Sequence, residues 1–158
     1  MDFEAEYNNR GRVPEHPAIF ARWAEASAAF RGRVAAADLG VPYGPSPRQI
    51  LDIVWPAPDR QAPVVLLIHG GYWRSLHPRD FTFPASALLS EGVALALAGY
   101  DLAPHVAMGT ILDQARLAAI TLHRLVSRPV PVAGHSAGAH LAAALTATRW
   151  RRIAPDLP

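Results

Sequence analysis

The sequence has no cysteine among its 158 residues. This absence excludes disulfide bonds, zinc sites built on thiolates and a thiol nucleophile. Lysine is missing too, so all fifteen basic residues are arginine. These arginines are scattered and the formal net charge is only +2, so no basic stripe predicts a nucleic-acid partner.

Long apolar runs are also missing, and no segment has the length and composition of a membrane-spanning helix. The first ten residues, MDFEAEYNNR, are acidic and polar, whereas an export signal would be basic and then apolar. We therefore expect a cytoplasmic protein without a membrane partner. Its length and its 51% of hydrophobic residues suit one globular domain, residues 1–158.

The N-terminal part, residues 1–47, is expected to form a helix and a loop. Residues 16–40 carry apolar side chains at spacings of three and four, and Pro17 suits a first helical turn, so they predict an amphipathic helix that ends near Gly40. The proline- and glycine-rich residues 41–49 predict a loop.

The rest of the chain, residues 48–158, is expected to form the core of a sheet. Four short apolar runs predict strands, and helical patterns lie between them; the runs are residues 50–55, 63–69, 93–100 and 130–135. The helical pattern of residues 109–127 is expected to place on one face Ile111, Ala115, Ala118, Leu122 and Leu125. This alternation predicts an α/β fold, a mostly parallel sheet with flanking crossover helices. Ligands of such sheets bind at the carboxyl ends of the strands.

Ser136 follows the last predicted strand in the sequence GHSAG, between Gly134 and Gly138. A serine on a sharp strand-to-helix turn is exposed for nucleophilic attack, and glycines at the flanking positions let the strand and the helix pass closely. The start of the next helix favours negative charge, so the Ala137 N–H is a candidate oxyanion donor. The alternative is that Ser136 merely caps the helix.

A second oxyanion donor is expected from the loop HGGYWR, which follows the strand at residues 63–69. The two glycines allow backbone angles that turn the Gly71 and Tyr72 N–H groups toward the serine. We interpret His69 as an anchor of this loop rather than as a catalytic base. Tyr72 and Trp73 are candidate substrate-binding residues that form an apolar wall, and ordinary packing is the alternative.

Three segments, HGGYWR, GYDLAP and GHSAGAHLAAAL, together resemble α/β-hydrolases of the kynurenine formamidase (arylformamidase) type, which are similar to hormone-sensitive-lipase-like esterases. The resemblance implies that Ser136 is the nucleophile and that Gly71, Tyr72 and Ala137 form the oxyanion hole. It implies hydrolysis of N-formylkynurenine to kynurenine and formate, with no cofactor and no metal. Related esterases cleave small carboxylic esters, so an aromatic formamide or an ester is the expected small-molecule substrate.

The catalytic serine of this fold needs an acid and then a histidine later in the chain. The 22 residues after Ser136 contain one histidine, His140, and one acid, Asp156, in the reverse order. His140 lies one helical turn beyond the serine and is poorly placed as a base. His77 and His105 are the only earlier histidines expected near the pocket. We therefore expect a partial α/β-hydrolase fold that lacks the C-terminal strands, or obtains them from another chain, and an impaired activity.

Without further strands, the strand before Ser136 would lie at the edge of the sheet and leave backbone groups unpaired. Such an edge predicts oligomers. The function of a different class that stays open is a non-catalytic fragment that binds aromatic ligands or a partner. A metal site is disfavoured because His135 and His140 are five residues apart, and no glycine motif for a dinucleotide is present.

Overall fold

The computed structural model describes residues 1–156, and its centre is a five-stranded sheet with the order β1-β2-β4-β3-β5. The strands are β1 (Ala36–Pro42), β2 (Ile50–Trp55), β3 (Val64–Ile68), β4 (Ala94–Ala98) and β5 (Val132–Gly134). β1 pairs with β2 and β2 with β4 in antiparallel fashion, whereas β3 is parallel to both β4 and β5. The sheet is therefore mixed, and its parallel half ends in β5, the strand that leads into Ser136.

The parallel half brings three strand ends to the same level. Ile68 at the end of β3 pairs with Ala98 of β4 on one side and with Gly134 of β5 on the other. The loops that follow these strands therefore leave the sheet next to one another. This register places the HGGYWR loop beside the turn that carries Ser136.

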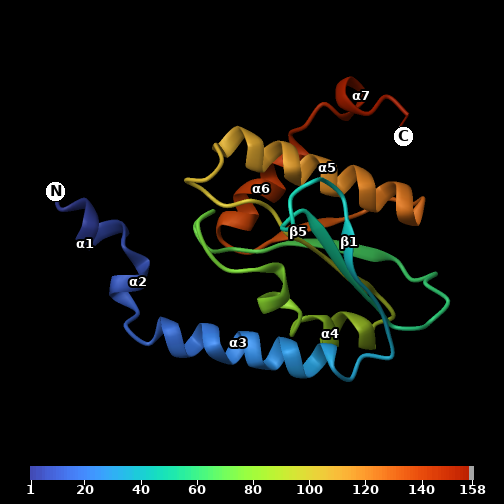
Figure 1. The fold of residues 1–158 in the computed structure, drawn as a ribbon, viewed down its shortest axis with the longest axis horizontal. Coiled ribbons are helices and arrows are strands. Elements are labelled where there is room, and N and C mark those ends of the chain that lie inside the picture. The colour runs from blue at the N-terminus through green and yellow to red at the C-terminus, as the bar shows by residue number, and fades with distance from the viewer. Residues whose placement is uncertain (157–158) are drawn as a thin grey trace.

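Helices cover both faces of the sheet, with α5 and α6 on one side and α3 and α4 on the other (Figure 1). The helical elements are α1 (Phe3–Tyr7), α2 (Asn9–Arg12), α3 (His16–Arg31), the 3-10 helix η1 (Pro78–Phe81), α4 (Ala85–Ser90), α5 (Met108–Val126), α6 (Ala137–Thr146) and α7 (Trp150–Ile153). None of the helices within residues 1–156 combines the length and the apolar character needed to cross a membrane.

The sequence of β4, ALALA, shows how one strand serves two cores. Its alanines join the core beneath α5 and α6, and its leucines Leu95 and Leu97 join the core beneath α3 and α4. Side chains alternate between the two faces of a strand, so a run without polar residues fits only a strand covered on both faces. The small alanines leave room for α5 to pack closely, where Ala115 and Ala118 are buried.

The N-terminal helix is shorter than expected, because α3 ends at Arg31 and not near Gly40. Residues 36–42, expected as helix end and loop, form the edge strand β1. Gly40 has a φ of +72° at an irregularity in the pairing with β2, and its N–H donates to the buried carboxylate of Asp52. Pairing with β2 thus overrides the helical preference of the alanine-rich segment, as tertiary contacts often do.

The long helix α5 buries most of the predicted face, including Ile111, Ala115, Ala118 and Leu122. Leu125, expected on the same face, is exposed, and Val126 is buried instead. Val126 is the last residue before Ser127, whose φ of 51° ends the helix and turns the chain toward β5.

Candidate active site

Ser136 occupies a strained turn between β5 and α6. Its φ of 53° and ψ of −117° lie in a region that residues with a side chain rarely adopt. The side chain is exposed and makes no capping hydrogen bond to α6. Ser136 stands at the N-cap position of α6, but its hydroxyl is not used as a cap and is free to meet a substrate.

The two glycines of the GHSAG motif allow the close approach that the turn requires. A Cβ added to Gly134 would collide with the Gly138 backbone and would lie 2.5 Å from Ala139 N. A Cβ added to Gly138 would collide with the carbonyl of Ile68 and would lie 2.6 Å from the carbonyl of His69. The elbow and the start of α6 are thus pressed against the end of β3 with no space for a side chain.

The HGGYWR loop directly contacts this elbow. A Cβ added to Gly70 would lie 2.9 Å from the carbonyl oxygen of His135 and 3.3 Å from the Cβ of Ser136. The first of the two glycines is therefore required for the loop to touch the serine. The second, Gly71, has a φ of +112°, and a Cβ there would collide with the carbonyl of Ser75.

The three predicted oxyanion donors share one property. Within residues 1–156, the N–H groups of Gly71, Tyr72 and Ala137 donate no hydrogen bond to another residue. Ala137 is buried and Gly71 is half-buried, whereas Tyr72 is exposed. Buried backbone N–H groups are almost always paired in proteins, so unpaired ones beside a strained serine are typical of a ligand site. Their role as an oxyanion hole stays a prediction that this geometry supports.

Tyr72 and Trp73 adopt positive φ angles of 56° each, directly after Gly71. Three successive left-handed residues are costly unless the surroundings hold them. Sequence reasoning assigned unusual angles to the glycines only, and nothing in the residue types of Tyr72 and Trp73 indicated them. The loop is held from outside: Ala103 N donates to the Trp73 carbonyl at 2.8 Å.

His69 is completely buried and anchors the loop, as its position suggested. Its Nδ1 lies 2.7 Å from the carbonyl oxygen of Gly70, which can only accept, so Nδ1 carries the proton. Its ring stacks on Tyr100 with 4.3 Å between centroids, and the Tyr100 hydroxyl donates to the His69 carbonyl at 2.9 Å. Burial lowers the pKa of His69 to about 3, so the ring is neutral at pH 7.

The two candidate substrate-binding residues differ in their surroundings. Tyr72 is 63% exposed, which leaves its ring available to a substrate. Trp73 is half-buried and packs against the core beneath α5, so the packing alternative holds for part of its surface. Its Nε1 atom is buried and has no hydrogen-bond partner within residues 1–156.

Within residues 1–156, no histidine ring forms a hydrogen bond with the Ser136 hydroxyl, although the His140 backbone N–H donates to the Ser136 carbonyl at 3.3 Å in the first turn of α6. His140 lies on α6, and its ring meets the Trp73 ring edge to face at 5.3 Å. His77 caps η1 by accepting from Arg79 N, and burial lowers its pKa. His105 is exposed in the loop after β4. No acid–histidine pair that could activate the serine is assembled in this part of the chain.

Residues of the segment 99–103 support the loop, although the sequence indicated the segment only through a resemblance. Arg48 links it to the segment just after the loop, because Nε donates to the Tyr100 carbonyl at 2.8 Å and Nη2 to the Leu76 carbonyl at 2.7 Å. Asp101 accepts from Ser46 Oγ at 2.5 Å and from the Gln114 side chain at 2.7 Å. No local pattern in the sequence predicts these long-range bonds.

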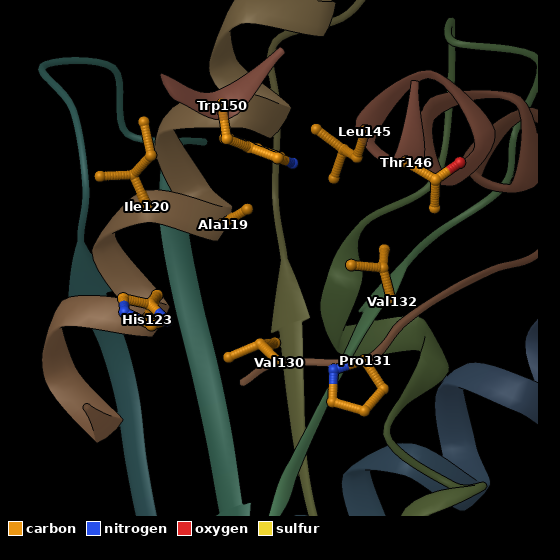
Figure 2. A pocket seen from close by; sticks show the side chains of 9 residues that line it. All are labelled: Ala119, Ile120, His123, Val130, Pro131, Val132, Leu145, Thr146 and Trp150. Atoms are coloured by element: carbon orange, nitrogen blue, oxygen red, sulfur yellow. The ribbon is translucent and has the colours of Figure 1, made fainter. Parts of the chain in front are cut away.

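An apolar pocket of about 340 Å³ lies away from this site (Figure 2). Its lining combines the approach to β5, the end of α6, and one side of α5; the residues are Ala119, Ile120, His123, Val130, Pro131, Val132, Leu145, Thr146 and Trp150. Ser136 stands at the carboxyl end of β5 and the opposite end of α6. The pocket therefore lies beside β5, at the opposite end of α6 from Ser136.

Known proteins resemble the chain in sequence and in fold, although no family model matches it. A kynurenine formamidase from Salmo salar is 36% identical over 115 residues, which are 71% of this chain and 39% of that protein. Esterase LipQ from Mycobacterium tuberculosis is 31% identical over 122 residues, 70% of this chain and 29% of that protein. The chain thus spans about two fifths of the formamidase that it matches.

A crystal structure from Silicibacter sp. TM1040, whose thioesterase assignment is provisional, superposes with a TM-score of 0.83 at 29% identity. It covers 99% of this chain, and the chain covers 57% of it. Esterase B from Lactobacillus rhamnosis superposes with a TM-score of 0.63 at 25% identity, over 84% of this chain and 48% of that one. The chain therefore has the α/β-hydrolase fold in part and is related to hydrolases, among them kynurenine formamidases and esterases.

Proposed function

We propose that this chain carries the nucleophile and the oxyanion hole of a serine hydrolase of the arylformamidase type. Ser136 is the nucleophile, and the N–H groups of Gly71, Tyr72 and Ala137 receive the oxyanion. The observation that carries the proposal is the contact of the HGGYWR loop with a strained, exposed serine, with all three N–H groups unpaired. Preorganised N–H groups at such a turn stabilise the charge of a tetrahedral intermediate.

The proposed reaction is the hydrolysis of N-formylkynurenine. The Ser136 oxygen bonds to the formyl carbon while its proton passes to a base, and the carbonyl electrons move to the oxygen that the N–H groups hold. The C–N bond then breaks, the amine takes the proton and leaves as kynurenine, and water releases formate from the serine ester. Similarity to kynurenine formamidases supports this substrate.

Removal of the Ser136 proton by a base is the step that this chain performs poorly by itself. His140 faces Trp73, and Asp156 pairs with Arg124 at 2.8 Å, so neither is joined to Ser136. We propose that residues 1–158 activate Ser136 only weakly. Removal of the triad base from serine hydrolases lowers kcat by about 10⁴- to 10⁶-fold, and the oxyanion hole retains the rest of the catalysis.

A fluorophosphonate probe tests the assignment because it reacts with serines whose oxyanion hole can stabilise the phosphonyl oxygen. We expect slow labelling of Ser136 in the folded wild-type chain and no labelling in S136A. H140A should be labelled at the same slow rate as the wild type. The labelling rate should rise steadily with pH and show no inflection between about 6 and 7, where a free histidine would titrate. Labelling of the denatured chain at the same rate would contradict the proposal.

A small carboxylic ester is the second candidate substrate, and the similarity to an esterase favours it. Phenyl acetate and N-formylkynurenine can be compared at equal concentration, with S136A as the control. Faster Ser136-dependent release of phenol than of kynurenine would select the esterase. Absence of both activities and of labelling in a folded chain would favour the non-catalytic function, the binding of an aromatic ligand or a partner.

We also propose that the free edge of β5 joins a second copy of this chain. Within residues 1–156, β5 pairs only with β3, and Val132 of β5 and Val130 just before it line the apolar pocket. Unprotected edges are prone to pair with other strands. Light scattering should show oligomers, and A133K, at the exposed residue of β5, should reduce them because a charge blocks the edge; a monodisperse wild-type monomer would contradict this. A cytoplasmic location and the absence of a nucleic-acid partner stay predictions of the sequence.

A further inference from the structure

The direction of the Tyr72 N–H depends on the carbonyl group before it. A trans peptide is planar, and its C=O and N–H point in opposite directions. Any group that holds the Gly71 carbonyl therefore also sets the direction of the Tyr72 N–H. The same holds for the Gly70 carbonyl and the Gly71 N–H, where the ring of His69 is the group that holds the carbonyl.

Two donors hold the Gly71 carbonyl. Ser75 Oγ donates to it at 2.9 Å, and Arg74 N donates to it at 3.0 Å. The bond from Arg74 closes the turn of the main chain itself. The bond from Ser75 comes from a side chain, so the residue at position 75 can change the orientation of this peptide without changing the path of the turn.

The hydroxyl of Ser75 is oriented in turn by a distant cation. Arg10, on the short helix α2, places Nη2 at 2.5 Å from Ser75 Oγ, where the serine oxygen accepts. Because the hydroxyl accepts from Arg10, its own proton is directed to Gly71. The guanidinium also lies 5.8 Å from the centre of the Phe20 ring, which favours its position beside α3. Arg10, Ser75 and Gly71 thus form one hydrogen-bonded relay.

We propose that Ser75 and Arg10 are positioning residues that direct the Tyr72 N–H into the oxyanion hole. This inference rests on the proposed function of Ser136, but the direction of an N–H group can be measured without any reaction. Neither residue touches the substrate; each acts through the Gly71 carbonyl. The relay also explains how an N-terminal segment 65 residues away in sequence contributes to the site.

Residual dipolar couplings of a ¹⁵N-labelled chain measure the direction of each N–H bond and test the proposal. In S75A the coupling of Tyr72 should change, while that of Ala137 should stay as in the wild type. S75T keeps the hydroxyl and should restore the wild-type coupling. S90A is the matched control, because Ser90 Oγ also donates to a carbonyl but does so in α4, and it should change neither coupling. An unchanged Tyr72 coupling in S75A would overturn the proposal.

The fluorophosphonate reaction gives a second readout. Loss of the Ser75 bond should lower the labelling rate of Ser136 about fivefold to tenfold. This effect is smaller than the roughly 10²- to 10³-fold loss that follows when an oxyanion donor is removed outright, because the Tyr72 N–H is only misdirected. R10Q should lower the rate about threefold, and the double variant should be no slower than S75A, because coupled residues are not additive. A double variant slower than S75A by the full R10Q factor would contradict the relay.

The two readouts separate failure of this inference from failure of the proposed function. If the wild-type chain is not labelled but the Tyr72 coupling changes in S75A, the assignment of Ser136 as a nucleophile is refuted and the relay stands. A labelled chain whose rate and coupling do not respond to S75A would refute the relay and leave the serine hydrolase standing.

Discussion

The two halves of the candidate site are positioned by different forces. The elbow at residues 134–138 is shaped by steric contact. Its two glycines leave no space for a Cβ, which lets β5, α6 and the end of β3 lie close together. The HGGYWR loop and the two residues after it are held by hydrogen bonds from distant residues: Ala103 bonds to Trp73, Arg10 to Ser75 and Arg48 to Leu76. A short motif can therefore encode the elbow, whereas the loop needs residues that are spread along the chain from Arg10 to Ala103.

The largest expected effect removes the steric fit of the elbow. G138A should destabilise the fold by about 3 kcal/mol, because the added methyl group collides with the Ile68 carbonyl and must push α6 away. G109A is the matched control, since Gly109 also lies in a helix but has no atom within 4 Å of an added Cβ, and it should stabilise by about 0.5–1 kcal/mol. Urea denaturation of both variants measures the difference; equal midpoints would refute the steric account.

A second variant separates the two halves from each other. G70A places a methyl group against the His135 carbonyl and the Ser136 Cβ, so it should cost about 1–2 kcal/mol and lower fluorophosphonate labelling by at least about tenfold. G109A again serves as the control, because its added methyl group enters open space on a helix without a positive φ. Full labelling in G70A would show that the loop contact does not contribute to the reactivity of the serine.

The pH dependence of stability tests the buried anchor of the loop. The pKa of His69 is lowered from 6.5 to about 3 by burial, so between these values the unfolded chain binds a proton that the folded chain does not. Stability should therefore fall as the pH drops from about 6.5 to 3, by up to ~1.4 kcal/mol per pH unit. His77, whose pKa burial also lowers, acts in the same direction.

Stability measured at pH 7 and pH 5 in H69Q should show a weaker fall than in the wild type. H105Q, at an exposed histidine, should leave the fall unchanged. The same pH dependence in H69Q and the wild type would mean that His69 is not the titrating group.

The smallest expected effect concerns the strain at Ser136. S136G should stabilise the fold by about 1 kcal/mol, because glycine adopts a φ of 53° and a ψ of −117° without a clash of its side chain. S86G, on the exposed side of α4, should destabilise by about the same amount, since helices disfavour glycine. A lower thermal midpoint for S136G would indicate that the turn is not strained.

Sequence patterns predicted the parts of the fold that depend on neighbours in the chain. The run ALALA and the helical spacing of Ile111, Ala115 and Ala118 identified β4 and α5 because burial on a strand or helix repeats along the chain. They did not predict β1, since its residues form a strand only by pairing with β2. The predicted burial of Leu125 was wrong for a related reason, because the turn at Ser127 ends the buried face of α5.

The sequence by itself determined the strand-turn-helix elbow and the glycine loop, because a contact without space for a Cβ requires glycine at a given position. Only the tertiary structure decided which N–H groups remain unpaired, how Tyr72 and Trp73 reach left-handed angles, and which distant residues hold them. The physical reason is that a glycine marks a close approach at its own position in the sequence, whereas the bonds from Arg10 and Arg48 follow no local pattern and exist only after the chain has folded.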